Sequence, residues 1–144
     1  MGLESEFFIA SASELKQVQL KNWPFVPKTF EQFSCKGLTN VELATLEALL
    51  TSKDALTIIE GDDTKPVMEG GIDGPWLLPL RPQLTKALSE AELETLPELA
   101  EQWAGTEELE GWDASDTEGV LNELYALAQS AVACGKKVYL LMWM

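Results

Sequence analysis

The sequence predicts a single α+β domain over residues 1–144, a small sheet with strands near both termini and helices packed mainly on one face. Three observations lead to this fold class. Short apolar runs at 7–10 and 138–143 are typical of buried strands. Between them lie repeated helix-start signals, with apolar residues at helical spacing. The chain of 144 residues is 46% hydrophobic, enough for a core of its own, and no linker divides it.

The first quarter of the chain begins with the strand at 7–10. Ser11 and Glu14 then have capping-box spacing, which predicts a short helix through about residue 20. Prolines end this helix, because the residue before a proline is pushed away from helical geometry. The aromatic stretch 29–35 fits either a short strand or an extended loop.

Thr39 and Glu42 form a second capping box and open a clearer helix, whose leucines share one face. The β-branched run 56–59 predicts a strand, and 66–68 is expected to pair back on it as a hairpin. The glycine-rich segment 70–74 then predicts a tight turn between strands, because it lacks the Gly-Lys-Ser/Thr ending of a phosphate-binding loop.

An apolar strand is expected at 76–80, and Pro82 suits the first turn of the helix that follows. Ser89 and Glu92 have the spacing of a third capping box. Pro97 either breaks this segment or begins a new helix.

The last helix is expected to begin near Asp116 or Thr117 and to run to Ala133, with apolar residues on most sides. Gly135 suits the position after its C-terminus, and the strand at 138–143 follows.

From residue 33 to 144 these elements resemble the YfbM-like bacterial proteins of unknown function. The resemblance is carried by short motifs, namely Gly37-Leu38-Thr39, Gly71-Ile72-Asp73-Gly74, Trp76-Leu77-Leu78-Pro79 and the closing helix–Gly135–strand unit. The chain lacks the tryptophan and histidine expected shortly before the Gly-Leu-Thr segment. The resemblance implies an α+β fold in a bacterial protein and carries no activity.

The composition argues against several function classes. Without histidine, the chain cannot build Ser-His-Asp or Cys-His nucleophilic sites and lacks the commonest zinc ligand. Ten basic and 24 acidic residues give a net charge of −14, which disfavours nucleic acids and anionic membranes as partners. No apolar run approaches the roughly 20 residues of a membrane span. The first residues are acidic, unlike a signal peptide, so we expect a cytoplasmic protein.

No cofactor or metal is expected from the sequence. Glu60, Asp62 and Asp63 could offer oxygen ligands to a divalent cation, but they do not match a calcium-loop pattern, and a solvated turn is the preferred interpretation. Cys35 and Cys134 are expected to be small buried residues in a reducing compartment rather than a disulfide, with a disulfide left open until their distance is known.

The acidity is concentrated in one part of the chain. Between Lys86 and Lys136 there are twelve acids and no basic residue, which leaves −14 minus −12, or −2, for the remainder. A field of one sign steers basic partners toward a surface. Trp103 and Trp112 flank the densest acids, and an aromatic residue beside charges is typical of an interface hot spot. Trp103 also continues an apolar stripe, so a core position is the alternative for it.

We therefore expect a non-enzymatic protein that binds a basic protein partner through residues 105–118, as an inhibitor or toxin-immunity protein does. The candidate contact residues are Glu107, Glu108, Glu110, Trp112, Asp113 and Asp116. One alternative is a small-ligand binder or carboxylate-dependent enzyme, with a pocket lined by Trp76, Trp103 or Trp143. Another is a housekeeping domain whose acidity serves solubility alone.

Overall fold

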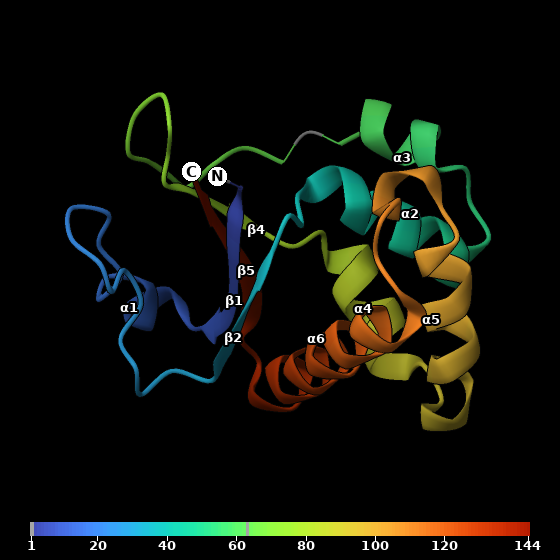
Figure 1. Ribbon diagram of the computed structural model, residues 1–144. Helices are drawn as coiled ribbons and strands as arrows, with labels where there is room; N and C mark the ends of the chain where they lie inside the picture. Colours follow the sequence, from blue (N-terminus) through green and yellow to red (C-terminus); the bar gives the residue numbers. More distant parts are fainter. Residues whose placement is uncertain (1, 63) are drawn as a thin grey trace.

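The computed structural model describes residues 2–62 and 64–144, and their α+β architecture confirms the predicted fold class (Figure 1). Within these residues, five strands form one antiparallel sheet in the order β2-β1-β5-β4-β3. The strands are β1 (Glu4–Ala10), β2 (Gln32–Lys36), β3 (Met68–Glu69), β4 (Trp76–Pro79) and β5 (Lys137–Trp143). The first and last strands of the chain therefore pair with each other at the centre of the sheet.

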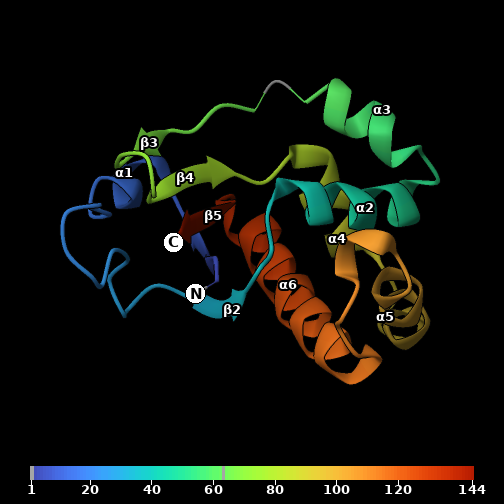
Figure 2. The same cartoon turned by 45° about the horizontal axis from the view of Figure 1, so that its top comes forward.

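The helices pack mainly on one face of this sheet, as predicted. They are α1 (Ala12–Leu15), α2 (Asn40–Thr51), α3 (Ala55–Glu60), α4 (Pro82–Glu90), α5 (Leu96–Ala104) and α6 (Ala114–Cys134), with 3-10 turns η1 (Leu93–Thr95) and η2 (Glu107–Leu109). Figure 2 shows α2, α4, α5 and α6 gathered on one side, while α1 and the loop after it lie on the other. The helix α6 contacts both central strands, β1 and β5.

Both faces of the central strands are buried, because successive side chains point to opposite sides. Phe7 and Ile9 belong to the main core between the sheet and the helices. Phe8 and Ala10 belong to a second, smaller core that α1 and the loop after it help to enclose, with Val18 among its fully buried residues. The loop after α1 therefore forms part of the hydrophobic core although it has no regular structure.

Two of the predicted capping boxes are confirmed. Ser11 Oγ accepts from the Glu14 backbone N–H at 3.1 Å, and the Ser11 N–H donates to Glu14 Oε1 at 2.9 Å. Thr39 and Glu42 cap α2 in the same way. The first helix is shorter than predicted, ending at Leu15. Of the stretch 29–35, left open between strand and loop, residues 32–35 belong to the strand β2 and residues 29–31 lie in the loop before it.

The predicted hairpin of 56–59 with 66–68 is wrong. Residues 56–59 lie in α3, whose N-terminus is capped by Asp54, with Oδ2 accepting from the Thr57 backbone N–H at 3.1 Å. A local cap outweighs β-branched propensity here, because that propensity reflects packing more than backbone preference. Met68 pairs instead with Leu77 of β4, and the glycine-rich segment is the turn between them, as predicted.

The third capping box is also wrong, because Ser89 lies inside α4 and its hydroxyl donates to the Lys86 carbonyl at 2.8 Å. Pro97 begins a new helix, α5, which settles the alternative left open by the sequence. The last helix starts at Ala114, slightly earlier than predicted, because Asp113 Oδ1 caps it by accepting from the Asp116 N–H at 2.7 Å. Gly135 ends it with a φ of 68°, a conformation that favours glycine.

The buried carboxyl of Glu6 makes the stability of this fold depend on pH. Glu6 lies in β1, is 6% exposed, and burial raises its pKa above the ordinary value of 4.5. Between pH 4.5 and the raised pKa, the folded protein therefore keeps the Glu6 carboxyl protonated, whereas the unfolded chain has released this proton. The contribution of Glu6 to stability is fully present below pH 4.5 and is lost as the pH rises through the raised pKa.

We expect Glu6→Gln, which cannot ionise, to be more stable than the wild type at pH 7. The difference should shrink as the pH falls toward 4.5. Urea unfolding across this pH range measures both quantities. A difference that does not change with pH would contradict this role for Glu6.

Candidate functional site

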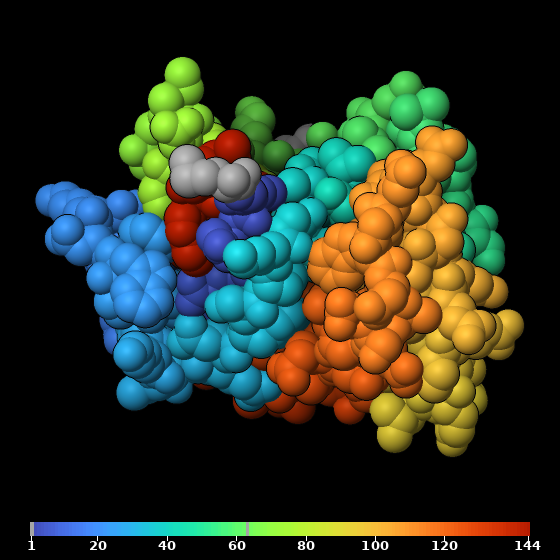
Figure 3. Space-filling view, viewed as in Figure 1, coloured from blue at the N-terminus to red at the C-terminus, as the bar shows by residue number. Residues whose placement is uncertain are grey.

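The six predicted contact residues lie together, between the end of α5 and the first turn of α6. Five are exposed carboxylates, Glu107, Glu108, Glu110, Asp113 and Asp116, and the sixth, Trp112, is partly buried. We call these six residues the acidic surface. Figure 3 shows the orange segment that carries them on the front face, beside the cyan β2. Leu109, which is fully buried, fixes the η2 turn to the core.

The two tryptophans near these acids have different roles. Trp103 is fully buried, and its Nε1 donates to the Glu42 carbonyl and to Thr45 Oγ1, both at 3.1 Å. It is therefore a core residue that ties α5 to α2. Trp112 packs against the main core but stays partly exposed, so it can contact both the core and a partner.

An open groove runs between β2 and the N-terminal half of α6. One wall is the strand, residues 33–36, and Trp112 closes the groove at the start of the helix. The other wall carries Asp116, Val120 and Glu123. These three residues share one face of α6, because Val120 follows Asp116 by four positions and Glu123 follows it by seven. The groove thus combines apolar side chains, among them Phe33, Trp112 and Val120, with two carboxylates on the helix and Lys36 on the strand.

The cysteine in this groove has a raised pKa. Burial, with a smaller contribution from the charge of Glu4, raises the pKa of the Cys35 thiol to about 12. The thiol therefore stays protonated at neutral pH, and the reactive form is the thiolate. Both cysteines are free, as predicted, but the expectation that both are buried is wrong for Cys134, which is exposed at the end of α6.

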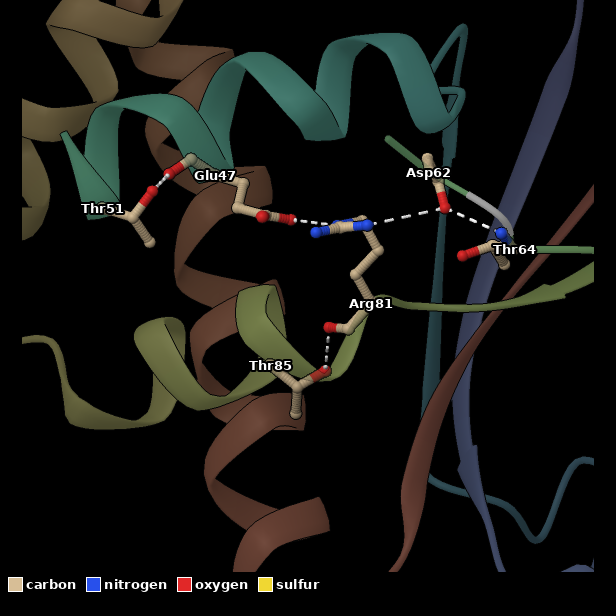
Figure 4. A network of polar contacts seen from close by, with 6 residues as sticks. All are labelled: Glu47, Thr51, Asp62, Thr64, Arg81 and Thr85. Carbon is tan, nitrogen blue, oxygen red and sulfur yellow. Dashed lines mark hydrogen bonds and ion pairs between the residues drawn. The ribbon is translucent and has the colours of Figure 1, made fainter. Parts of the chain in front are cut away.

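Sequence reasoning missed a buried ion pair, which Figure 4 shows. Glu47 of α2 has a side chain only 1% exposed, and its Oε1 accepts from Arg81 Nε at 2.9 Å. Asp62 Oδ1 lies 3.7 Å from Arg81 Nη1 and also accepts from the Thr64 N–H at 2.9 Å. The hydrogen bond to Glu47, with the charges of Glu47 and Asp62, raises the pKa of Arg81 against the opposing effect of burial.

A small cavity adjoins this pair. It is lined by Glu47, Arg81 and Asp62, with Asn40 and mostly aliphatic side chains around them. Its volume is about 40 Å³, and about 10–15 Å³ of such volume holds one water molecule. Among the described residues, Glu47 Oε2 has no hydrogen-bond partner. A buried carboxylate oxygen therefore remains available beside space for a few non-hydrogen atoms.

The other predicted sites have separate outcomes. Trp76 is partly buried against the main core, and Trp143 packs edge-on against Phe25 with ring centroids 5.2 Å apart.

Asp63, one of the three acids considered for a cation, lies outside the described residues. Within residues 2–62 and 64–144, no group of three or more metal-ligating side chains is close enough to hold an ion. Over the same residues, no helix combines the length and hydropathy that crossing a membrane requires.

The Glu47–Arg81 pair yields a stability prediction. We expect Arg81→Met to lower the free energy of unfolding by about 3–5 kcal/mol, because it leaves a buried carboxylate without its partner. The double variant Glu47→Met with Arg81→Met should recover most of this loss, since well-packed apolar residues can replace a buried pair. Urea denaturation of the wild type, the single variant and the double variant gives the three free energies of unfolding.

The exposed pair Lys86–Glu90 supplies a matched control, with its two side chains 79% and 60% exposed. Lys86→Met should change stability by no more than about 0.5 kcal/mol. Equal losses from Arg81→Met and Lys86→Met would show that the buried pair has no special importance.

No protein-family model, curated protein or solved structure matches this chain. The resemblance to the YfbM-like proteins therefore stays a prediction.

Proposed function

We propose that this protein is a non-enzymatic binding module that captures a basic partner protein in the bacterial cytoplasm through its acidic surface. The observation that carries the proposal is electrostatic. Among the described residues, none of the five carboxylates of the acidic surface forms an ion pair. No Lys or Arg occurs in residues 87–135 to neutralise them. A basic partner would relieve this repulsion and would be steered to the site.

Trp112 gives the surface an apolar anchor. Part of its side chain is fixed against the main core, so little conformational freedom is lost when a partner contacts the remainder. Tryptophan is enriched among the residues that dominate binding energy, especially where charged residues surround it. The charges would then set the rate and specificity of association, and Trp112 would slow dissociation.

The functional class we propose is an inhibitor or toxin-immunity protein. An enzyme that binds nucleic acid presents a basic surface, because it must neutralise phosphates. A compact acidic surface with an aromatic anchor has the complementary charge to cover such a site. This class also agrees with the absence of histidine, because inhibition requires no general base.

We expect the triple charge reversal Glu107→Lys, Glu108→Lys and Glu110→Lys to abolish capture of basic proteins by the immobilised protein. The reason is that the net charge of the acidic surface changes from −5 to +1, although Asp113 and Asp116 are unchanged, so a basic partner is no longer attracted. Mass spectrometry of the retained proteins, followed by affinity measurement on the partner found, tests this. Wild-type binding should also weaken as salt increases.

A matched control reverses Glu92, Glu94 and Glu98, which are also exposed and lie at or before the start of α5. The charge change is the same, but these residues lie at the opposite end of α5 from η2. The control should retain the partner. Capture that survives the first reversal, or that both reversals abolish equally, would argue against the acidic surface as the binding site.

The cavity beside Glu47 favours a second candidate function, the binding of a small molecule. Its charged groups are two carboxylates and one guanidinium, so the site carries one net negative charge. With Glu47 Oε2 available, the ligand that fits is a small cation that donates hydrogen bonds, such as a primary ammonium group.

We expect methylammonium chloride to raise the Tm of the wild-type protein more than equal concentrations of sodium chloride or tetramethylammonium chloride. Tetramethylammonium is the control because it has the same charge, a larger volume and no hydrogen-bond donor. The Glu47→Gln variant should lose the difference, since ligand binding stabilises only a fold that retains the site. Equal effects of the two organic cations on the wild type would rule out this site.

A further inference from the structure

The strand β2 lies at one edge of the sheet and has an unpaired side. Hydrogen bonds run from the Ile9 N–H to the Glu31 carbonyl and from the Gly37 N–H to the Leu3 carbonyl. In an antiparallel ladder, residues alternate between facing their partner strand and facing away from it. The backbone groups of Gln32, Ser34 and Lys36 therefore point away from β1.

This unpaired side borders the groove. Residues 33–36 form the strand wall of the groove along most of β2, and Ser34 is exposed. Exposed N–H and C=O groups on an edge strand are a template for pairing with another chain. The opposite edge of the sheet offers much less, because β3 is only two residues long.

The groove suits an extended chain with basic side chains. Asp116 and Glu123 are seven residues apart on α6, which corresponds to about 10 Å along the helix axis. Alternate side chains of a strand are about 7 Å apart, so lysines two or four positions apart can reach both carboxylates. Val120 lies between the two acids, where an apolar residue of the same strand would pack.

We propose that an extended basic segment of the partner protein adds to the sheet as a further strand beside β2, in the groove over the N-terminal half of α6. The proposal depends on the proposed function for the charge of the partner. Main-chain hydrogen bonds to Gln32, Ser34 and Lys36 supply affinity, and the α6 wall selects lysine or arginine. A second copy of this chain is the wrong occupant, because each copy carries a net charge of −14.

The test uses a short synthetic peptide in which lysine, valine and lysine alternate with threonine. Calorimetric titration should show binding to the wild type, and the same peptide with glutamate for lysine should not bind. Two N-methylated forms of the peptide separate strand addition from simple charge attraction. Methylation of the N–H groups on the side that faces β2 should weaken binding at least tenfold. Methylation of the N–H groups on the side that faces away from β2 should have little effect.

A variant of the protein provides an independent arm. Ser34→Pro removes an N–H that points into the groove while leaving the ladder with β1 intact, whereas Ser34→Ala retains that N–H. Peptide affinity should fall at least tenfold for the proline variant only, with the fold checked by circular dichroism. In the wild-type complex, the amide of Ser34 should exchange more slowly with solvent than in the free protein.

The outcomes distinguish this inference from the proposed function. Equal binding of both methylated peptides, or no binding of the lysine peptide, would overturn strand addition. If the triple charge reversal still abolished partner capture in that case, the acidic surface would stand as the binding site without it. One-sided methylation effects together with partner capture that survives the charge reversal would support strand addition and reject the acidic surface. A dimer of the free protein in sedimentation, formed through β2, would make a second copy the occupant and overturn the inference.

Discussion

The antiparallel pairing of β1 with β5 is the interaction on which the rest of this structure depends. It joins residues from the two ends of the chain, from Glu4 with Trp143 to Ala10 with Lys137. Each strand contributes alternate side chains to the main core and to the second core. Loss of this pairing would therefore open both cores at once. Because the paired residues are so far apart in sequence, the entropy of closing the chain must be overcome before either core is complete.

This central pair also determines where the groove lies. Since one side of β1 is occupied by β5, β2 pairs on the other side and becomes the edge of the sheet. The helix α6 runs directly into β5 through Gly135, so its C-terminal end is fixed near the centre of the sheet. Its N-terminal half then extends past the edge strand, and Trp112 and the carboxylates lie there.

Most features set by neighbouring residues could be predicted from the sequence, whereas contacts between residues far apart in the chain could not. Local spacing correctly predicted the capping boxes at Ser11 and Thr39 and the αL glycine at Gly135, but the same capping spacing failed at Ser89, which lies inside α4. The error at 56–59 arose because the cap from Asp54 was not weighed against β-branched propensity.

The same distinction applies to the candidate site. The clustering of the acids was visible in the sequence, since it depends on the lack of Lys and Arg over one continuous stretch. The groove was not, because it needs β2 and α6 to be placed side by side. The pair of Glu47 and Arg81, 34 residues apart, left one signal, a glutamate on the buried face of α2 at helical spacing from Leu43. Its partner could be found only in three dimensions.

The Cys35 thiol in the groove is protonated at neutral pH, whereas the exposed Cys134 thiol offers a separate site for chemical attachment. Oxidants and alkylating agents attack thiolates, and the Cys35 thiol in the groove wall holds its proton far above neutral pH. Cys134 is exposed at the other end of α6, eleven residues or about 16 Å of helix beyond Glu123. A fluorophore or a solid support attached to Cys134 would leave β2, Trp112 and the α6 wall of the groove free for a partner. The protein is thus suited to oriented immobilisation without the introduction of a new cysteine.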